Sequence, residues 1–532
     1  MLFAAACVSS SGEPEVWAGG AGMAGPPGPA PIVVNEVYTN NDSLWADPRG
    51  GFPDVVELYN PGPDDLSLDR VTLTDGSEAT WQGPAEVLAA GHTYVVMADD
   101  GVGPDHAPFR LSADGDWLTL SVDGLPVDRL ATGVQPDDVG MARFPDGGTF
   151  RPSTLATLGA PNPAEPPATL DPRDQVFQGD RVIEIDMRLT PEAYDILAAG
   201  GGFGGPRNSA PAAVTIDGVA FPEVAVKLKG SGSFEPITGK PAWKIDLNKA
   251  IPGTRFRKLK ALTLNNGNTF DPTRAHEDLS YALAREVGVP APRVGWVHLT
   301  VNDMDYGLYQ NIETWDDVLV ERLWPGDVDG QLWEGSGSDF GSFWFGGGLN
   351  FDYEEGPEDP DTWVIDAIDA IVDGPANASA IEALWQVVDR DAFLTYMAWE
   401  IVAAHWDGYK SPNNWRFYVH GGKDQALWLA TGTDFTWWEA PETRFGGSVA
   451  NFCLDVPVCA TELSRHLLVV SYAADDMDLV SRFEQRSTLI DPFIFSDPRS
   501  KHTDGAIRRN RASTRDLLES NPADARRLAV GL

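Results

Sequence analysis

The residues best suited to chemistry lie in one polar loop and just beyond the two apolar stretches that follow it. The loop contains Asp407, Asn413 and Asn414, and Asp434 comes after the second apolar stretch. A carboxylate can accept a hydroxyl proton, and neighbouring amide and carboxylate oxygens can bind a divalent cation. Kinase-type phosphotransferases use this order of proton-accepting Asp, metal-binding Asn and metal-binding Asp. The spacing indicates a phosphoryl-transfer site.

The elements that must position these groups can be read from the same stretch. Two strands, WRFYVH and QALWLA, flank a GGKD turn, so a β-hairpin separates the loop from Asp434. The loop opens with His405-Trp406-Asp407, which is similar to the HRD of a kinase loop. Its asparagines follow Asp407 by six and seven positions rather than five, so the loop is not a standard kinase loop.

An upstream segment can complete such a site. A turn between two strands contains Gly230 and Ser231, whose backbone N–H groups could lie against phosphate, and Lys244 on the second strand could reach the same oxygens. On the helix that follows, Glu277 or Glu286 could orient that lysine, as an ion pair does in protein kinases. These residues predict a nucleotide site.

Residues 31–163 alternate short apolar runs with NPG, TDG and VDG turns, a pattern typical of an antiparallel β-sandwich. Residues 164–175 are rich in Pro and predict a linker. From 176 to 525 the pattern changes to strands mixed with helices. It includes a helix capped by Thr190 and an amphipathic helix for which Asp271 is the expected cap. We therefore expect an all-β domain followed by an α+β domain.

The first of these domains resembles the lamin-tail family. The resemblance rests on NEVYTNN, DVVELYNPG, FRLSADGDWLTL, FPDG and GAPN. It implies an immunoglobulin-like sandwich used for binding or surface attachment. Glu36, Asp54, Glu57 and Asn60 could be imagined as a metal cluster, but such residues at strand ends are expected to be turn and capping groups.

The second domain resembles the spore-coat CotH kinase-like family. The motifs include VAVKLKGSGS, KPAWKIDLN, LTLNN, DPTRAHEDLSYALAREVGVPAPR, VNDMDYGLYQNIE, WDGYKSPNNWRFY and TDFTW, in family order. The family implies an atypical protein-kinase-like fold that phosphorylates proteins on Ser with ATP and a divalent metal, Mg²⁺ or Mn²⁺. The residues assigned through it are Asp407 as catalytic aspartate, Asn413, Asn414 and Asp434 at the metal, and Lys229 and Lys244 at the phosphates.

One departure from the family concerns the metal site. Many relatives read WDLD where this chain reads TGTD, with Gly432 and Thr433 in place of an Asp-Leu pair. One metal carboxylate fewer favours a single metal or weak nucleotide binding. Two other motifs are coincidences of sequence. Asp339-Phe340-Gly341 spells DFG but precedes Asp407, and GGGFGGPRN at 200–208 has no Lys-Ser or Lys-Thr after it.

Composition and cysteine usage indicate where the protein works. The 532 residues have a formal net charge of −40, which disfavours nucleic acid as a partner, and no apolar run could span a membrane. MLFAAAC resembles the end of a lipoprotein signal, so residues 1–30 are interpreted as a signal remnant with a possible lipid at Cys7, followed by a flexible tether. Cys453 and Cys459 are expected to form a short-loop disulfide, in agreement with export.

Three functions remain open at this stage. The first is an exported, monomeric, ATP-dependent kinase that acts on proteins of the bacterial envelope or surface. The second is a catalytically weak or inactive surface scaffold, which the missing acidic residue favours. The third is carbohydrate binding through Trp437 and Trp438, although clustered aromatic residues more often pack beside a site.

Overall fold

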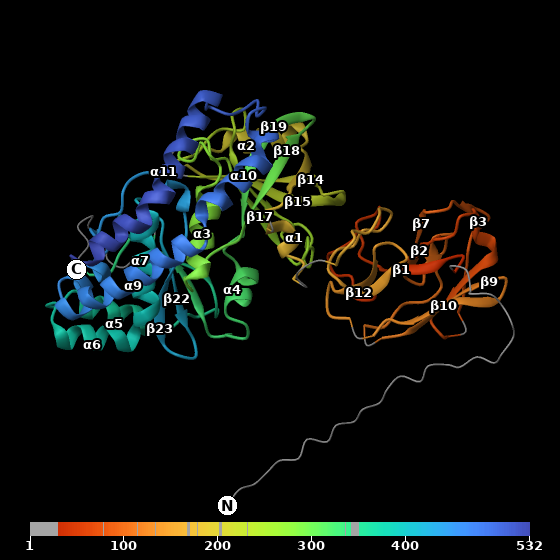
Figure 1. Cartoon of the computed structure of the whole chain (residues 1–532), viewed down its shortest axis with the longest axis horizontal. Helices are drawn as coiled ribbons and strands as arrows, with labels where there is room; N and C mark the ends of the chain where they lie inside the picture. The colour runs from red at the N-terminus through yellow and green to blue at the C-terminus, as the bar shows by residue number, and fades with distance from the viewer. Residues whose placement is uncertain are drawn as a thin grey trace, which may run out of the picture.

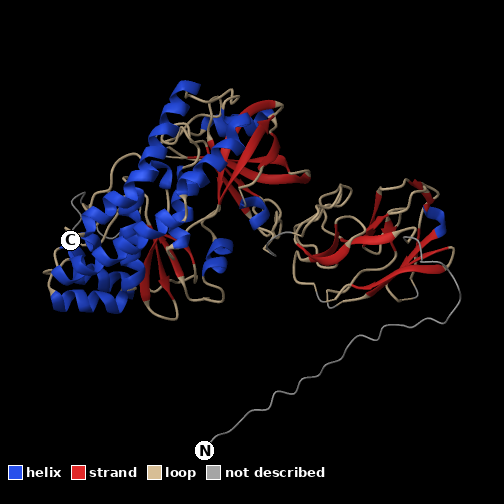
Figure 2. Cartoon of the chain, in the orientation of Figure 1, coloured by secondary structure: helices blue, strands red, loops and turns tan. Residues whose placement is uncertain are grey.

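The computed structural model describes residues 30–531 except 78, 114, 134, 167–170, 178, 202–204, 231, 336 and 342–350. An all-β region comes first in the chain and an α+β region follows it (Figure 1, Figure 2). This agrees with the expected order of folds.

The N-terminal region contains a six-stranded and a four-stranded sheet that share one apolar core. The larger sheet runs β12 (Thr149–Ser153), β11 (Gly140–Phe144), β1 (Val33–Tyr38), β2 (Asp54–Tyr59), β7 (Thr93–Ala98) and β8 (His106–Ala107). The smaller sheet runs β10 (Leu125–Ala131), β9 (Trp117–Val122), β4 (Val71–Thr74) and β5 (Trp81–Gln82), and β3 (Leu66–Ser67) pairs with β6 (Val87–Leu88). The 3-10 turn η1 (Leu68–Arg70) joins β3 to β4. Alternating burial along β4 and β9 reflects one face on the core and one facing water.

A closed barrel opens the α+β region. Its order is β13 (Val182–Arg188), β14 (Ser209–Ile216), β15 (Val219–Lys229), β16 (Ala242–Asp246), β17 (Ala261–Asn265), β19 (Met304–Ile312) and β18 (Val294–Val301). Parallel pairing of β13 with β18 closes it. The turn between β14 and β15 places Asp217 at φ 48° and Gly218 at φ 84°, which is why a DG pair stands there. Leu262 and Leu264 of β17 point into the barrel core, so Thr263 and Asn265 point outward.

Helices beside the barrel differ in how well their starts were predicted. In α2 (Pro191–Ala199) the hydroxyl of Thr190 accepts from the Ala193 amide, as expected for its cap. The helix for which Asp271 was the expected cap is α3 (His276–Glu286). Asp271 caps the preceding turn instead, and its carboxylate accepts from the amides of Arg274 and His276 at 3.0 Å each. The helix starts late because Arg274 is left-handed, at φ 58°.

A second, smaller sheet and a group of helices complete the region. The sheet runs β21 (Asp352–Glu355), β20 (Gln331–Glu334), β22 (Arg416–His420) and β23 (Gln425–Leu429). The helices are α1 (Asp174–Phe177), α4 (Asp317–Leu323), α5 (Trp363–Val372), α6 (Ala378–Val387), α7 (Arg390–Ala403), α8 (Ser448–Leu454), α9 (Pro457–Asp476), α10 (Leu479–Ile494) and α11 (Asp504–Ala529). Helices α7, α9 and α11 pack together on one side of this sheet (Figure 1). Within the described residues, no helix is long and apolar enough to cross a membrane.

The expected disulfide is confirmed. Cys453 near the end of α8 and Cys459 in the first turn of α9 are bonded, and both are buried. The two cysteines are 6 positions apart in sequence, so the bond fixes the local corner between two helices rather than a distant contact.

Candidate active site

Asp407 lies in the loop between α7 and β22, and both asparagines of that loop hold it. The side-chain amide of Asn413 donates to one carboxylate oxygen at 2.9 Å, and that of Asn414 donates to the other at 2.8 Å. The backbone N–H of Asn414 also donates to the Asp407 carbonyl at 2.8 Å. Because the amide nitrogens face Asp407, the amide oxygens point away from it and can bind a cation.

A buried pair, Glu400 and His405, holds the loop from beneath, and the sequence did not single out Glu400. Glu400, at the end of α7, accepts from the backbone N–H groups of Tyr409 at 2.8 Å and Lys410 at 3.1 Å. Its carboxylate also lies 3.2 Å from Nδ1 of His405, whose Nε2 is 3.1 Å from the Gly432 carbonyl oxygen. The loop is thereby tied to the turn before Asp434.

Asp434 follows the β22–β23 hairpin in sequence and lies in the short 3-10 turn η2 (Thr433–Phe435). Burial raises the pKa of its carboxyl group, and the charges of Asp271 and Asp407 raise it further. A cation beside Asp434 would oppose these effects, so the group fits a divalent metal. Among the described residues no cluster of three or more His, Cys, Asp or Glu side chains could hold a metal. A cation here would therefore depend on Asp434 together with asparagine oxygens.

The lysine nearest the helix glutamate is Lys229, not Lys244. The Lys229 ammonium donates to Oδ1 of Asn265 at 2.8 Å, and Nδ2 of Asn265 donates to the two oxygens of Glu277 at 3.0 and 3.1 Å. Burial lowers the pKa of Lys229 and raises that of Glu277, while each charge opposes the shift of the other. Lys229, Asn265 and Glu277 therefore form one charged chain from β15 to α3.

Lys244 lies on the same outer barrel face but faces other partners. It pairs in register with Lys227 on one side and Thr263 on the other. Its charge acts against the burial that raises the pKa of Asp316 to about 7. Glu286 is exposed at the end of α3, so of the two candidate glutamates only Glu277 reaches the lysine chain.

Gly230 follows Lys229 in a left-handed conformation, at φ 99°. Its carbonyl oxygen accepts from Arg207 at 2.6 Å, and the Arg207 guanidinium lies 4.2 Å from the centre of the Phe234 ring. The turn is thus held from outside the barrel. Ser231, the other residue expected to contact phosphate, lies outside the described residues.

Residues 497–501, between α10 and α11, contact residues 238–240 of the same connection between β15 and β16. We call residues 497–501 the clamp segment. Asp497 and Lys240 form an ion pair whose side chains are both fully buried. Arg499 donates to the carbonyl oxygens of Thr238 at 3.0 Å and Gly239 at 2.5 Å. Sequence patterns gave no sign of this role, because the partners are more than 250 positions apart.

The TGTD sequence before and at Asp434, which departs from the expected WDLD, has a structural reason at Gly432. Gly432 is left-handed, at φ 62°, and a Cβ atom built there would lie 2.5 Å from Cβ of Asn414. The small residue therefore allows the close approach of Asn414 to this turn.

Asp339 and Phe340 of the DFG tripeptide make buried structural contacts. Asp339 accepts from the hydroxyl of Tyr409 at 2.9 Å and from the backbone N–H of Ser448 at 2.7 Å, and Phe340 is fully buried. Of the two tryptophans considered for carbohydrate, Trp437 is buried and its indole donates to Ser280, whereas Trp438 is 40% exposed.

Comparison with known protein families gives matches to both regions of the chain. The family described as CotH kinase protein matches residues 226–467, and the family described as Lamin Tail Domain matches residues 26–133. No curated protein sequence matches the chain. The chain carries a lamin tail domain and a CotH kinase domain. Every candidate active-site residue named above falls within the CotH match, whereas the clamp segment lies beyond it.

Charged groups of the lamin tail domain behave as structural groups. Glu36 and Glu57 are cross-strand neighbours, and both are buried. Glu57 accepts from Asn35 at 2.8 Å and from the Gly159 amide at 2.6 Å. Asn60 donates to the Leu88 carbonyl oxygen at 3.1 Å. The acidic and amide residues considered above as a metal cluster therefore stabilise turns and strand pairing.

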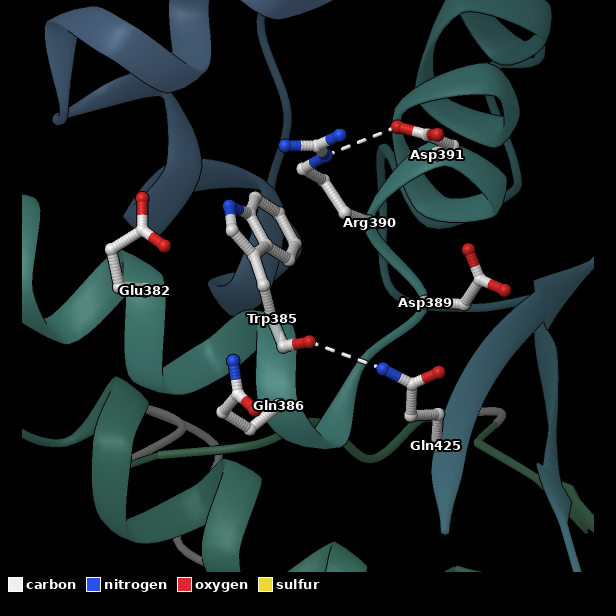
Figure 3. A pocket seen from close by; sticks show the side chains of 7 residues that line it. All are labelled: Glu382, Trp385, Gln386, Asp389, Arg390, Asp391 and Gln425. Carbon is white, nitrogen blue, oxygen red and sulfur yellow. Dashed lines mark hydrogen bonds and ion pairs between the residues drawn. The ribbon is translucent and has the colours of Figure 1, made fainter. Parts of the chain in front are cut away.

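The CotH domain also has a polar surface pocket of ≈ 320 Å³ at the ends of α6, α7 and β23 (Figure 3). Its side chains bind one another: Arg390 donates to Asp391 at 3.1 Å, and Gln425 donates to the Trp385 carbonyl oxygen at 3.1 Å. None of the candidate catalytic residues lines it.

Proposed function

We propose that the CotH domain is an ATP-dependent protein kinase of atypical kinase-like fold that phosphorylates Ser or Thr of envelope or surface proteins. The observation that carries this proposal is the meeting of three groups around one turn. Asp407 is held by two asparagine amides. The Asp407 charge raises the pKa of Asp434, so the two carboxylates are close. The Asp434 charge in turn acts to raise the pKa values of Lys229 and Glu277, so the third group is close as well.

In this proposal Asp407 accepts the proton of the acceptor hydroxyl as its oxygen bonds to phosphorus. The bond from the γ-phosphorus to the bridging oxygen breaks, and that oxygen leaves on ADP. ATP with Mg²⁺ or Mn²⁺, when bound, supplies the phosphoryl group and its charge neutralisation. Asp434, Asn413 and Asn414 would hold the cation, while Lys229 and the Gly230 turn would orient the phosphates.

The proposed location is outside the cytoplasm. The disulfide between Cys453 and Cys459 is stable in an oxidising compartment, which supports export to the envelope or beyond. A lipid at Cys7, which lies outside the described residues, would anchor a monomer, and the lamin tail domain would attach it to the surface.

A second candidate is a kinase-like scaffold without transfer. It is favoured by Gly432, which leaves the metal turn with one carboxylate fewer than many relatives have. Under this hypothesis Asp434 would remain protonated near neutral pH, as the raised pKa of its carboxyl group favours.

Labelled ATP separates the two candidates. The full chain with Mg²⁺ or Mn²⁺ should phosphorylate itself or an added protein. Asp407→Asn should abolish transfer but keep nucleotide binding, whereas Asp434→Ala should lose both. Absence of label together with absence of metal-dependent ATP binding by calorimetry would establish the scaffold instead.

A further inference from the structure

Four aromatic side chains form a cluster at the edge of the candidate site, and we call it the aromatic platform: Phe270, Trp406, Phe435 and Trp438. Phe435 is at its centre. The Phe435 ring centroid is 5.2 Å from that of Trp406, 5.2 Å from that of Trp438 and 5.3 Å from that of Phe270. Phe435 and Trp438 are stacked with an interplanar angle of 10°, so each ring covers part of one face of the other.

The platform is continuous with the proposed catalytic groups. Trp406 immediately precedes Asp407, and Phe435 immediately follows Asp434. The backbone N–H of Trp406 donates to the Phe435 carbonyl oxygen at 3.3 Å, which joins the two short segments. A molecule on the platform would therefore lie beside both carboxylates.

Exposure sets two platform tryptophans apart from those of the nearby core. Trp406 is 46% exposed and Trp438 is 40% exposed, whereas Trp399, Trp415 and Trp428 are fully buried. Neighbouring indoles left open to water beside a reactive carboxylate are typical of binding surfaces.

Charge indicates what kind of side chain would lie there. Lys410 pairs with Glu439 at 3.1 Å and Glu442 at 2.7 Å, so one ammonium faces two carboxylates next to the platform. The chain as a whole has a formal net charge of −40. A cationic partner would be attracted, and a guanidinium can stack on an aromatic face, as Arg499 does on Tyr306 at 3.6 Å.

We infer that the aromatic platform binds the acceptor polypeptide by stacking an arginine side chain that lies close to the Ser or Thr receiving phosphate. This inference rests on the proposed function, because the acceptor is the partner that must approach Asp407. A nucleobase is the competing occupant, and the experiment below separates the two.

The test uses the full chain and a library of peptides with one fixed serine and one varied neighbour. Peptides with arginine should be phosphorylated best, those with lysine less well, and those with glutamate least. Trp406→Ala and Trp438→Ala should each raise KM for the arginine peptide about tenfold and leave KM for ATP unchanged. Trp438→Phe should restore most of the affinity, which distinguishes lost stacking from misfolding.

The matched control is Trp117→Ala, which removes a 54% exposed tryptophan of the lamin tail domain and should change neither constant. A rise in KM for ATP alone would assign the platform to the nucleobase, and no arginine preference would overturn the inference. If the protein transfers no phosphate, peptide binding can still be measured by fluorescence anisotropy of the labelled peptide without nucleotide. Peptide binding that depends on Trp406 would then support the aromatic platform and refute only the kinase proposal. Peptide binding that is independent of Trp406 and Trp438 would overturn the inference.

Discussion

Asn265 lies between Lys229 and Glu277, so hydrogen bonds through its amide link the two charged groups, which are not in direct contact. A lysine ammonium has three N–H donors, and Lys229 gives one of them to Asn265. Its remaining donors suit phosphate oxygens. The amide thus positions the lysine without neutralising it as a direct carboxylate contact would.

Adding a carboxylate at Gly432 should harm this site rather than improve it. In Gly432→Asp, the new Cβ would lie 2.5 Å from Cβ and 2.7 Å from Cγ of Asn414, in a left-handed backbone. Asn414 must then move away from Asp407, and we expect a loss of roughly 1–3 kcal/mol in stability. Scanning fluorimetry and calorimetric titration with MgATP should show a lower Tm and weaker binding.

Gly422→Asp is the control for that change. Gly422 lies in the exposed turn between β22 and β23, and a Cβ there would be 3.5 Å from the His420 ring, which is ordinary contact. It should leave the Tm and nucleotide binding unchanged. An unchanged Tm with stronger MgATP binding in Gly432→Asp would contradict the steric argument.

At the residue scale the sequence identified the right chemical types but not all the partners. Asp407, Asn413 and Asn414 are adjacent in the structure because one short loop contains them all. Which strand lysine meets Glu277 depends on the register of β15 against β16 and on where α3 crosses the barrel. Periodicity alone does not determine those distances, so Asn265 was missed although LTLNN had been noted as a motif.

At the scale of elements, the clamp segment binds the turn after Gly230 through a buried ion pair. Burial lowers the pKa of Lys240 to about 7, and the Asp497 charge opposes that shift. The Lys240 ammonium also donates to the Tyr306 carbonyl oxygen at 3.0 Å. Breaking this buried pair on one side leaves an uncompensated charge inside the protein.

We therefore expect Asp497→Ala to lower the free energy of unfolding by about 3–5 kcal/mol. The double variant Lys240→Met with Asp497→Leu should recover most of that loss, because it removes both charges and keeps the volume. Urea denaturation followed by tryptophan fluorescence measures both.

Arg70→Ala offers a comparison on the surface, since Arg70 pairs with Asp123 at 2.5 Å and both side chains are more than half exposed. Its urea midpoint should match that of the parent. If Asp497→Ala behaved in the same way, the clamp segment would have no role in stability.

Elements with local signals were predicted well, and elements fixed by distant contacts were not. The β22–β23 hairpin and the Thr190 cap follow from turn residues and spacing that lie within the elements themselves. The predicted start of α3 was wrong by four residues because a left-handed Arg274 interrupts the first turn. Arg274 is buried and bound to neighbouring loops, which its own position in the sequence does not reveal.

The two domains touch through a defined contact. The Ser43 hydroxyl and carbonyl of the lamin tail domain accept from the backbone N–H groups of Lys258 at 2.6 Å and Arg257 at 3.2 Å. Asp138 accepts from the Ser43 backbone N–H at 2.7 Å and thereby holds that loop. Each domain nevertheless has its own apolar core, so the whole molecule should unfold in two steps.

The lamin tail step should depend on pH. Burial, together with the neighbouring Glu57 charge, raises the pKa of Glu36 to about 8 from an ordinary value of 4.5. Folding therefore favours protonated Glu36. Its contribution to stability is complete below about pH 4.5, falls as pH rises, and is lost above about pH 8. Calorimetric scans should show the Tm of this step decreasing from pH 5 to pH 8.

Glu36→Gln should flatten that dependence, because the amide stays neutral throughout. Burial also raises the pKa values of Glu57 and Asp138, and that of Asp54 to about 6, so some slope should remain. Replacing the exposed Glu86 by Gln serves as the reference and should leave the slope as it is. A slope identical in all three proteins would refute the assignment to Glu36.

The clamp segment also determines when the proposed site can be assembled. Lys240 and Asp497 are separated by 257 positions, and the strands around Lys240 leave the ribosome long before Asp497 is made. At synthesis rates of about 5–20 residues per second that interval is roughly 13–50 s. Throughout it Lys240 lacks its buried counter-ion, so a nascent chain can contain every proposed catalytic residue while the turn after Gly230 is still unsupported. Completion of the proposed nucleotide site is thereby coupled to synthesis of the segment after α10.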